Sequence, residues 1–305
     1  MQTPCPSSFL ALNRAFSLFL GLFAGLALQA NYAPVITQGA GPLTLTIDQN
    51  SSRASWTTWD RRFGAFENDV FNDAVSTPDG GYLLIGKSNS PIHGDKTQPI
   101  RGSYDYWLVK VDPNGNKTWD KRYGGESNDE AHGVVTAPDG GYLILGTTNS
   151  SADGDMTQTS RGQSDYWAIK LDADGNKTWD KRYGGSLDET GASLVAASDG
   201  GYLMFGNSNS QAGGDKSDAP LGQQDYWAVK IDGNGNKVWD KTYGGTSGDY
   251  AYSALATNDG GFLLLGYSSS GAGGNKTDPG AGDKDFWAVR INAAGNVIWD
   301  KAYGG

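Results

Sequence analysis

Cysteine, positive charge and helical patterning are all scarce in this sequence. The single cysteine, Cys5, lies in the first thirty residues, so the rest of the chain cannot form disulfides and must be held together by packing. There are 24 lysines and arginines against 34 aspartates and glutamates, and this acidic balance excludes the basic face that nucleic-acid binding needs. Beyond the first thirty residues no window carries an apolar stripe at helical spacing, which argues against an α-helical fold.

Glycine and aromatic residues, by contrast, are plentiful. The 45 glycines among 305 residues are about twice the usual share. Charged residues make up only 19% of the chain, and ten tryptophans and fifteen tyrosines supply ample core material. This composition indicates a folded chain rather than a charged, disordered one.

The first thirty residues have a composition of their own. Arg14 is their only charged residue, and an apolar run from Ala15 to Ala30 is followed by the polar Asn31. This pattern predicts a secretory signal peptide over residues 1–30, with cleavage after Ala30 and no stable membrane insertion of the remaining chain. The alternative is a retained anchor, because sixteen apolar residues nearly reach the spanning minimum of about seventeen.

The rest of the chain repeats with a period of sixty residues and no slippage. A Trp-Asp pair recurs at Trp59, Trp119, Trp179, Trp239 and Trp299. An Asp-Gly-Gly-aromatic run begins at Asp79, Asp139, Asp199 and Asp259, and an Asp-aromatic-Trp run begins at Asp105, Asp165, Asp225 and Asp285. Such regular spacing indicates recent duplication of one structural unit.

Each copy has the pattern of four short β-strands joined by turns. In residues 128–184 the strings AHGVV, YLILG, DYWAIKLD and KTWDKRYGG have strand character, and glycine-rich turns separate the first from the second and the third from the fourth. Four antiparallel strands per repeat, with glycines and aromatics at fixed places, are typical of a β-propeller blade. A β-solenoid is the alternative, but its coils are shorter and its strands parallel.

We therefore expect an all-β fold, a β-propeller of four 60-residue, four-stranded antiparallel blades over residues 59–305. Two tryptophan series would form the layer between blades, and the prediction is sharpest for burial of Trp119, Trp179 and Trp239. Five Trp-Asp strands against four Asp-Gly-Gly hairpins leave the strand at Trp59 without a blade. The ring is thus expected to be open or incomplete and to associate through heterologous contacts; the alternative is a closed, monomeric four-bladed ring.

The strings DGGYLLIGKSNS and GDKTQPIRGSYDYWLVKVDPNGNKTWDKRYGG, with their copies, resemble the SBBP and delta-60 β-propeller repeats of secreted bacterial proteins. The resemblance covers residues 59–305 and implies a propeller fold and an exported, secreted or cell-surface setting, but no particular activity. Residues 31–56 resemble the opening strand of cadherin-like or immunoglobulin-like repeats. We expect residues 31–58 to be a linker followed by a degenerate edge strand.

One recurring turn motif resembles two kinds of functional site but matches neither completely. Asp172–Asn176 and its copies resemble the start of a calcium loop, yet the further oxygen ligands and the closing glutamate are missing, so a hairpin turn explains them. The same turns resemble the Asp-box of sialidases, but the glycine is one position early and the serine is absent. The arginines at 62, 122 and 182 recur with the repeat, so they form no unique cluster.

Residues that break the repetition are the better candidates for a ligand site, namely Glu67, His93, Glu130 and His132. His132 falls on the first strand of its repeat, where its counterparts are Asn72, Ala192 and Tyr252, and it either faces a ligand or is a solvated channel histidine. The sequence contains no Ser/His/Asp arrangement, metal-ligand spacing or phosphate-binding loop. It therefore predicts no catalytic residue, metal or cofactor.

Two recurring families of acids allow two interpretations. They could offer carboxylates to a cation or to sugar hydroxyls, or they could cap turns by accepting backbone N–H groups, and we favour the caps. The first family is Asp95, Asp155 and Asp215, with Asn275 in the fourth copy; the second is Asp69, Asp129 and Asp249, with Glu189.

These features predict a non-enzymatic exported repeat scaffold that mediates protein or surface interaction, with a protein or glycan at the cell surface as partner. The alternative is a carbohydrate- or cation-binding propeller domain of an extracellular enzyme. A convergent set of unlike polar groups on the row of first strands would favour that alternative.

Overall fold

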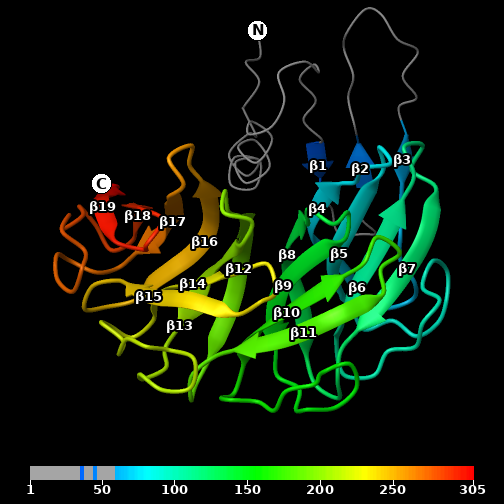
Figure 1. Ribbon diagram of the computed structural model, residues 1–305, viewed down its shortest axis with the longest axis horizontal. Coiled ribbons are helices and arrows are strands. Elements are labelled where there is room, and N and C mark those ends of the chain that lie inside the picture. The colour runs from blue at the N-terminus through cyan, green and yellow to red at the C-terminus, as the bar shows by residue number, and fades with distance from the viewer. Residues whose placement is uncertain (1–34, 38–43, 47–58) are drawn as a thin grey trace, which may run out of the picture. The chain divides into compact units, whose positions relative to one another are not determined.

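The computed structural model describes residues 35–37, 44–46 and 59–305, and the chain divides into two units, residues 1–62 and 63–305 (Figure 1). The second unit contains four sheets of four strands each. Their strands are β4 (Asp69–Ser76), β5 (Tyr82–Ser88), β6 (Asp105–Val111) and β7 (Lys117–Tyr123); β8 (Asp129–Thr136), β9 (Tyr142–Thr148), β10 (Asp165–Leu171) and β11 (Lys177–Tyr183); β12 (Glu189–Ala196), β13 (Tyr202–Ser208), β14 (Asp225–Ile231) and β15 (Lys237–Tyr243); β16 (Asp249–Ala256), β17 (Phe262–Ser268), β18 (Asp285–Ile291) and β19 (Val297–Tyr303).

Each sheet is an antiparallel meander in which neighbours in sequence are neighbours in space. This confirms the all-β prediction of four sixty-residue, four-stranded blades and excludes parallel solenoid coils in this unit. The turns contain the glycines that the sequence pattern required: Gly140 has φ 82° between β8 and β9, and Gly175 has φ 77° between β10 and β11.

The four sheets follow one another in chain order along an arc, with their first strands on the inside (Figure 1). The first strands of consecutive sheets contact one another, β4 with β8, β8 with β12, and β12 with β16. The sheets β4–β7 and β16–β19 stand at the two ends of the row, as expected for an open arrangement.

The core lies between consecutive sheets. Between the first two sheets, Leu83, Ile85 and Tyr106 pack against Ile144 and Trp167, all nearly inaccessible to solvent. The tryptophan of each third strand is buried and donates its indole N–H to an aspartate of the next strand, as Trp167 does to Asp180 at 3.2 Å. An apolar face that one four-stranded sheet cannot cover alone is therefore covered by the next sheet.

The tryptophans of the fourth strands are less buried than predicted. Trp119, Trp179 and Trp239 are only partly buried, although each packs against the core between its own sheet and the next. Trp119 lies against the turn at Gly175, where a Cβ atom would come within 2.8 Å of the indole ring. The ring therefore covers a turn at the edge of the interface rather than its centre, which explains its remaining exposure.

Residues 1–62 contain a sheet of three short strands, β1 (Val35–Thr37), β2 (Thr44–Thr46) and β3 (Asp60–Arg61). The pairing of Thr46 with Asp60 has the register of Val109 with Asp120 in the first full sheet. The strand at Trp59 joins none of the four four-stranded sheets, as expected from five Trp-Asp strands and four hairpins, and it pairs with β2 instead. The strands β1 and β2 lie within residues 31–58, for which a linker and a degenerate edge strand are predicted.

The predicted signal peptide over residues 1–30 lies outside the described residues. Within the described part of the chain, no helix has the length and apolar character needed to cross a membrane.

Candidate functional site

The repeats differ from one another most sharply at a few positions. Within the sixteen strands of the four sheets, only three positions carry a different residue in every repeat. Two lie on the first strand and one on the second; a fourth such position directly precedes the third strand. The four sets, which we call the variable columns, are Val70, Glu130, Thr190 and Tyr250; Asn72, His132, Ala192 and Tyr252; Lys87, Thr147, Asn207 and Tyr267; and Tyr104, Ser164, Gln224 and Lys284.

Members of the variable columns from three successive sheets meet at one cavity of about 240 Å³. Asn128 and Asn149 complete its lining. The members that line it are Lys87, Tyr104, Glu130, His132, Thr147 and Thr190.

The charges in this cavity pair with each other. The Lys87 ammonium is 2.8 Å from a Glu130 carboxylate oxygen and 5.0 Å from the centre of the Tyr104 ring. The Asn72 side chain donates to the Ala131 carbonyl oxygen at 2.7 Å and reaches the other Glu130 oxygen at 3.4 Å. The cavity therefore presents donors and acceptors without a net charge.

His132 stands in this cavity as a neutral imidazole at neutral pH. Burial lowers its pKa below the usual value, the nearby Glu130 carboxylate opposes this, and the Lys87 ammonium adds to it. Because Glu130 is held by Lys87, these three residues do not form the base–orienter–nucleophile relay that acyl transfer uses. The arrangement is suited to hydrogen bonding with a polar ligand.

The other two residues that break the repetition lie elsewhere. His93 stacks on Phe66, with ring centroids 3.6 Å apart, in the loop between β5 and β6. The backbone N–H of Glu67 donates to the Ser90 hydroxyl at 3.0 Å. The structure thus brings Glu130 and His132 together and leaves Glu67 and His93 out of the cavity.

In the fourth sheet the same columns form a cluster of aromatic rings. Tyr250 and Tyr267 are stacked with centroids 4.7 Å apart, and Tyr252 lies 5.6 Å from Tyr267. The Lys284 ammonium sits 5.2 Å from the Tyr267 ring, and Tyr252 is 65% exposed. One scaffold therefore presents polar groups on the second sheet and aromatic rings on the fourth.

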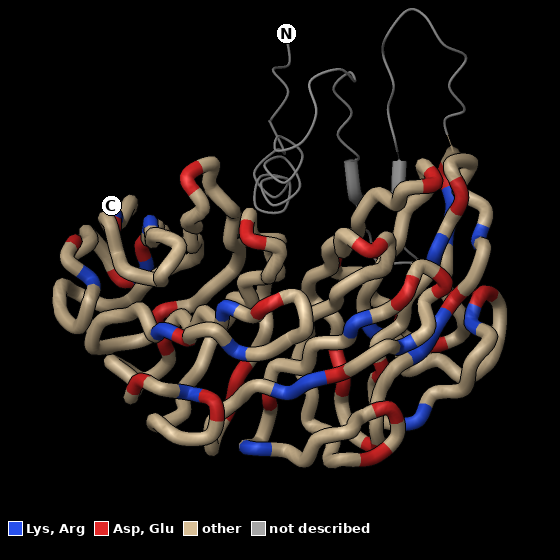
Figure 2. The backbone as a smooth tube through the Cα atoms, viewed as in Figure 1, with Lys and Arg blue, Asp and Glu red and all other residues tan. Residues whose placement is uncertain are grey.

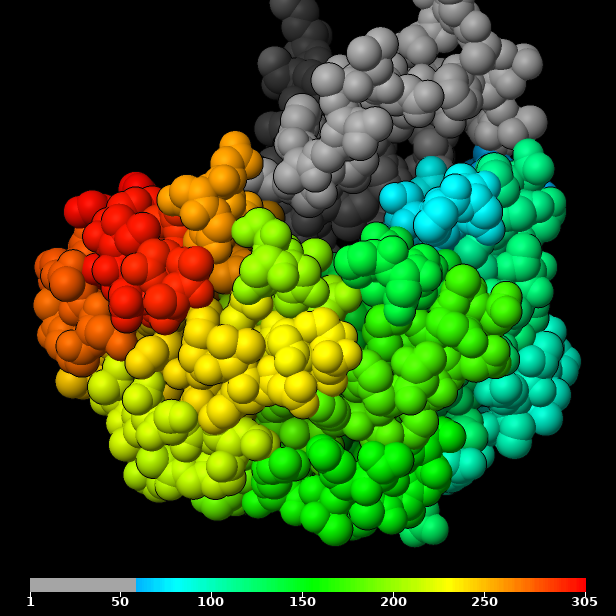
Figure 3. Space-filling view, in the orientation of Figure 1, coloured from blue at the N-terminus to red at the C-terminus, as the bar shows by residue number. Residues whose placement is uncertain are grey.

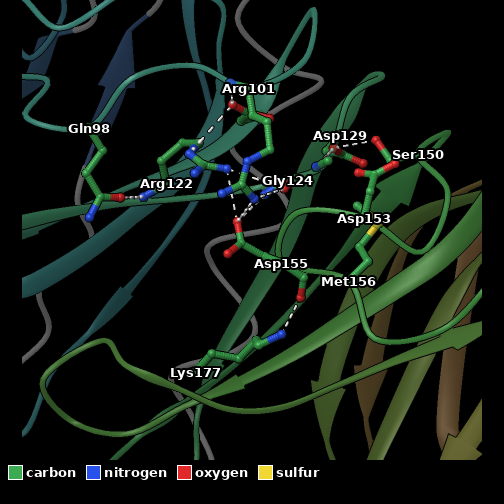
Figure 4. Close-up of polar contacts among 12 residues, drawn as sticks. Gln98, Arg101, Arg122, Gly124, Asp129, Ser150, Asp153, Asp155, Met156 and Lys177 are labelled. Atoms are coloured by element: carbon green, nitrogen blue, oxygen red, sulfur yellow. Dashed lines mark hydrogen bonds and ion pairs between the residues drawn. The ribbon is translucent and has the colours of Figure 1, made fainter.

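The recurring acids act as caps and ion-pair partners, in agreement with the favoured interpretation. Figure 4 shows Asp155 reached by Arg122 and Arg101 of the first sheet, at 3.0 and 3.2 Å, and by the backbone N–H of Gly124 at 3.1 Å. Asp129 accepts the Gly125 N–H at 2.8 Å, and burial raises its pKa to about 6. These oxygens hold the turns between sheets.

The turn at Asp172 is a hairpin turn that the Asp172 side chain itself caps. The Asp172 carboxylate accepts the backbone N–H groups of Asp174 and Asn176, and these bonds, led by that of Asn176, lower its pKa. Within residues 59–305 and the two short strands before them, no group of three or more His, Cys, Asp or Glu side chains is placed to hold a metal ion. Charges of both signs alternate over the sheets (Figure 2).

Sequence analysis singled out Glu130 and His132 but not Lys87, Tyr104, Thr147 or the tyrosine cluster. The signal that could have found them is the comparison of repeats column by column. Residues with a common structural task recur every sixty positions, whereas these differ in every copy.

Comparison with known protein families finds no match. Among curated proteins, the regulatory protein FlaEY of Caulobacter vibrioides is 25% identical over 172 residues, which cover 53% of this chain and 18% of that protein. The matched part of the chain thus spans less than a fifth of the relative's length.

Several solved structures resemble the chain, including the following two. One is a protein of unknown function from Bacteroides caccae, with a TM-score of 0.46 and 10% identity, covering 90% of this chain and 94% of that one. The other is the apocarotenoid oxygenase of Synechocystis, with a TM-score of 0.42 and 13% identity over 89% and 57% of the two chains.

Proposed function

We propose that the chain is a non-enzymatic, exported repeat scaffold that binds a protein or surface partner at the cell surface through its variable columns. The observation that carries this proposal is the meeting of those columns in space. A scaffold that needs only to stack its sheets has no reason to vary the same three strand positions in every copy while no other strand position varies so completely.

Further features support the role. Repeat proteins present a continuous surface across neighbouring repeats, as the columns do here across β8, β9 and β12. The predicted signal peptide supports export. The pairing of Lys87 with Glu130 supports recognition of a neutral partner surface, and the exposed Tyr252 is a side chain of the kind that binding surfaces favour.

Carbohydrate binding is the second candidate. The cavity between the first three sheets favours it, because hydroxyl, amide and imidazole groups without net charge match the donors and acceptors of a neutral sugar. Its volume of about 240 Å³ suits a single sugar unit rather than an extended chain.

The test transfers residues of the third sheet to the same positions of the second sheet. In the variant Glu130→Thr, His132→Ala, Thr147→Asn, the second sheet carries the residues that the third sheet has at the same positions. The labelled chain and this variant are applied to fixed bacterial cells that are untreated, protease-treated or oxidised with periodate. We expect the chain to bind untreated cells and the variant to lose that binding.

The treated cells separate the two candidates. Loss of binding after protease supports a protein partner, and loss after periodate supports a glycan. Equal binding by the chain and the variant on untreated cells contradicts the proposal for either class.

A further inference from the structure

The outer surface of the sheet β16–β19 is unlike that of the other sheets. In the first three sheets, the side chains that face the following sheet are buried or packed against it, whereas their counterparts on the fourth are accessible. Phe286, Trp299 and Tyr303 are 48%, 42% and 61% exposed. On the third sheet, Tyr226 and Tyr243 are the counterparts of Phe286 and Tyr303, and they are only 0% and 2% exposed. We call Leu263, Leu265, Phe286, Trp299 and Tyr303 the end face.

Three consecutive interfaces show what these positions do when covered. A tyrosine of the third strand donates its hydroxyl to the carbonyl oxygen of the next sheet's tryptophan; Tyr166 reaches Trp227 at 3.0 Å and Tyr226 reaches Trp287 at 3.2 Å. A tyrosine of the fourth strand donates to the carbonyl oxygen of the next sheet's turn glycine, as Tyr243 does to Gly295 at 2.7 Å.

The fourth-strand tryptophan completes the contact. At each interface its ring lies against the same turn glycine, so that a Cβ atom on Gly175, Gly235 or Gly295 would come within 2.8 to 3.1 Å of it. These glycines also have positive φ angles of 75° to 79°. We call the side of a sheet that accepts these contacts its receiving surface. It consists of the glycine turn with positive φ, the carbonyl oxygen of that glycine, and the carbonyl oxygen of the third-strand tryptophan.

We propose that the end face is an acceptor surface for a further blade of this same sixty-residue repeat. The end face carries counterparts of the residues that make the internal interfaces: Trp299 to pack on the glycine turn and Tyr303 to donate to its carbonyl oxygen. Phe286 supplies the ring of the third-strand tyrosine but not its hydroxyl donor. This inference is independent of the partner bound by the variable columns.

The experiment joins a copy of residues 186–245 to the C-terminal side of Gly305, which preserves the sixty-residue phase. Hydroxyl-radical footprinting read by mass spectrometry measures the oxidation of Phe286, Trp299 and Tyr303 in the chain with and without the added blade. When the blade is present, we expect oxidation of Phe286 and Tyr303 to fall toward that of Tyr226 and Tyr243 in the original chain. Oxidation of Trp299 should fall only toward that of the partly buried Trp239 in the original chain. Unchanged oxidation of the three residues in the extended chain overturns the proposal.

A control separates seating from mere proximity. In the same extended chain, the added glycine that copies Gly235 is replaced by alanine, and we expect oxidation of Trp299 and Tyr303 to return toward that of the original chain.

The original chain is also footprinted over a range of concentrations. Protection that grows with concentration would overturn the proposal, because a second copy rather than a further blade would then cover the end face. Figure 3 shows β19 at the end of the row of sheets.

Discussion

The interior positions of the repeat and its variable columns follow opposite rules. In the interior the same residues return every sixty positions and make the same contacts. The indole–aspartate bond occurs in all four sheets, and the tyrosine–glycine bond occurs at all three interfaces. In the variable columns no residue returns, and the side chains line a polar cavity in one place and form a tyrosine cluster in another. The comparison separates the interior residues, which stack the sheets, from the variable columns, which make one sheet differ from the next.

If this separation is correct, the largest effects on stability come from the interior. Trp167→Ala removes a fully buried ring and leaves Asp180 without its indole partner, so we expect a loss of about 3–5 kcal/mol in the free energy of unfolding. Urea denaturation measures the change. Trp299→Ala is the matched control, because its ring is 42% exposed and its removal should cost far less. Similar midpoints for the two variants would contradict the account of the interfaces.

Gly175→Ala should have the next largest effect. The residue has φ 77° and lies under the Trp119 ring, so a methyl group meets both backbone strain and a side chain. We expect a loss of about 1–3 kcal/mol, measured as a lower urea midpoint. Gly271→Ala serves as control, since no atom lies within 4 Å of the added Cβ and its φ is not left-handed. A wild-type midpoint for Gly175→Ala would show that the turn is not a receiving surface.

The interface between the first two sheets should also make stability depend on pH. Burial raises the pKa of Asp73 to about 7, against 3.8 for an unperturbed aspartate, while its carboxylate accepts the Val134 N–H. Between these values the folded chain holds a proton that the unfolded chain has released, so stability from this group falls as pH rises from about 4 to about 7.

Asp73→Asn removes this dependence while keeping an acceptor for the Val134 N–H. We expect the variant to gain stability relative to the original chain at pH 8 and to gain little at pH 4, as measured by urea midpoints at both values. An equal difference at the two pH values would show that Asp73 does not titrate in this window.

Changes in the variable columns should affect stability least. Lys87→Thr introduces the residue of the second repeat and breaks the ion pair with Glu130. The side chains of Lys87 and Glu130 are 25% and 32% exposed. We expect a change below about 1 kcal/mol, because partly exposed ion pairs contribute little. Thermal and urea denaturation check this, and a loss comparable to that of Trp167→Ala would assign Lys87 to the interior instead.

Much of the fold follows from the sixty-residue period. Turn glycines at 140 and 175 and alternating strands between them predict the meander, and the buried Trp167 series follows from the need to cover each sheet. The partial exposure of Trp119 did not follow, because the same pattern is compatible with a ring at the centre or at the edge of an interface. The pairing of the strand at Trp59 with residues 44–46 was missed since that segment shares no motif with the repeat.

The candidate site was predictable only in part. His132 and Glu130 stand out because they break the repetition, but a single sequence does not tell which strand positions face a common cavity. That depends on the offset between consecutive sheets, which brings Lys87 of β5 to Glu130 of β8 across an interface. The tyrosine cluster was hidden for a different reason: it depends on the register between β16 and β17 of one sheet, which places Tyr250 opposite Tyr267.

The most direct test of the separation compares two swap variants of the second sheet. One changes the variable columns to the residues of the third repeat, Glu130→Thr, His132→Ala and Thr147→Asn; the other changes the interior in the same way, Ile144→Met and Leu145→Phe. Binding to untreated fixed cells is measured beside the urea midpoint for both. We expect the first to lose binding with an unchanged midpoint, and the second to keep binding while losing about 1–3 kcal/mol of stability through altered packing. The opposite result, with binding kept by the first variant or lost only with the second, would contradict the account.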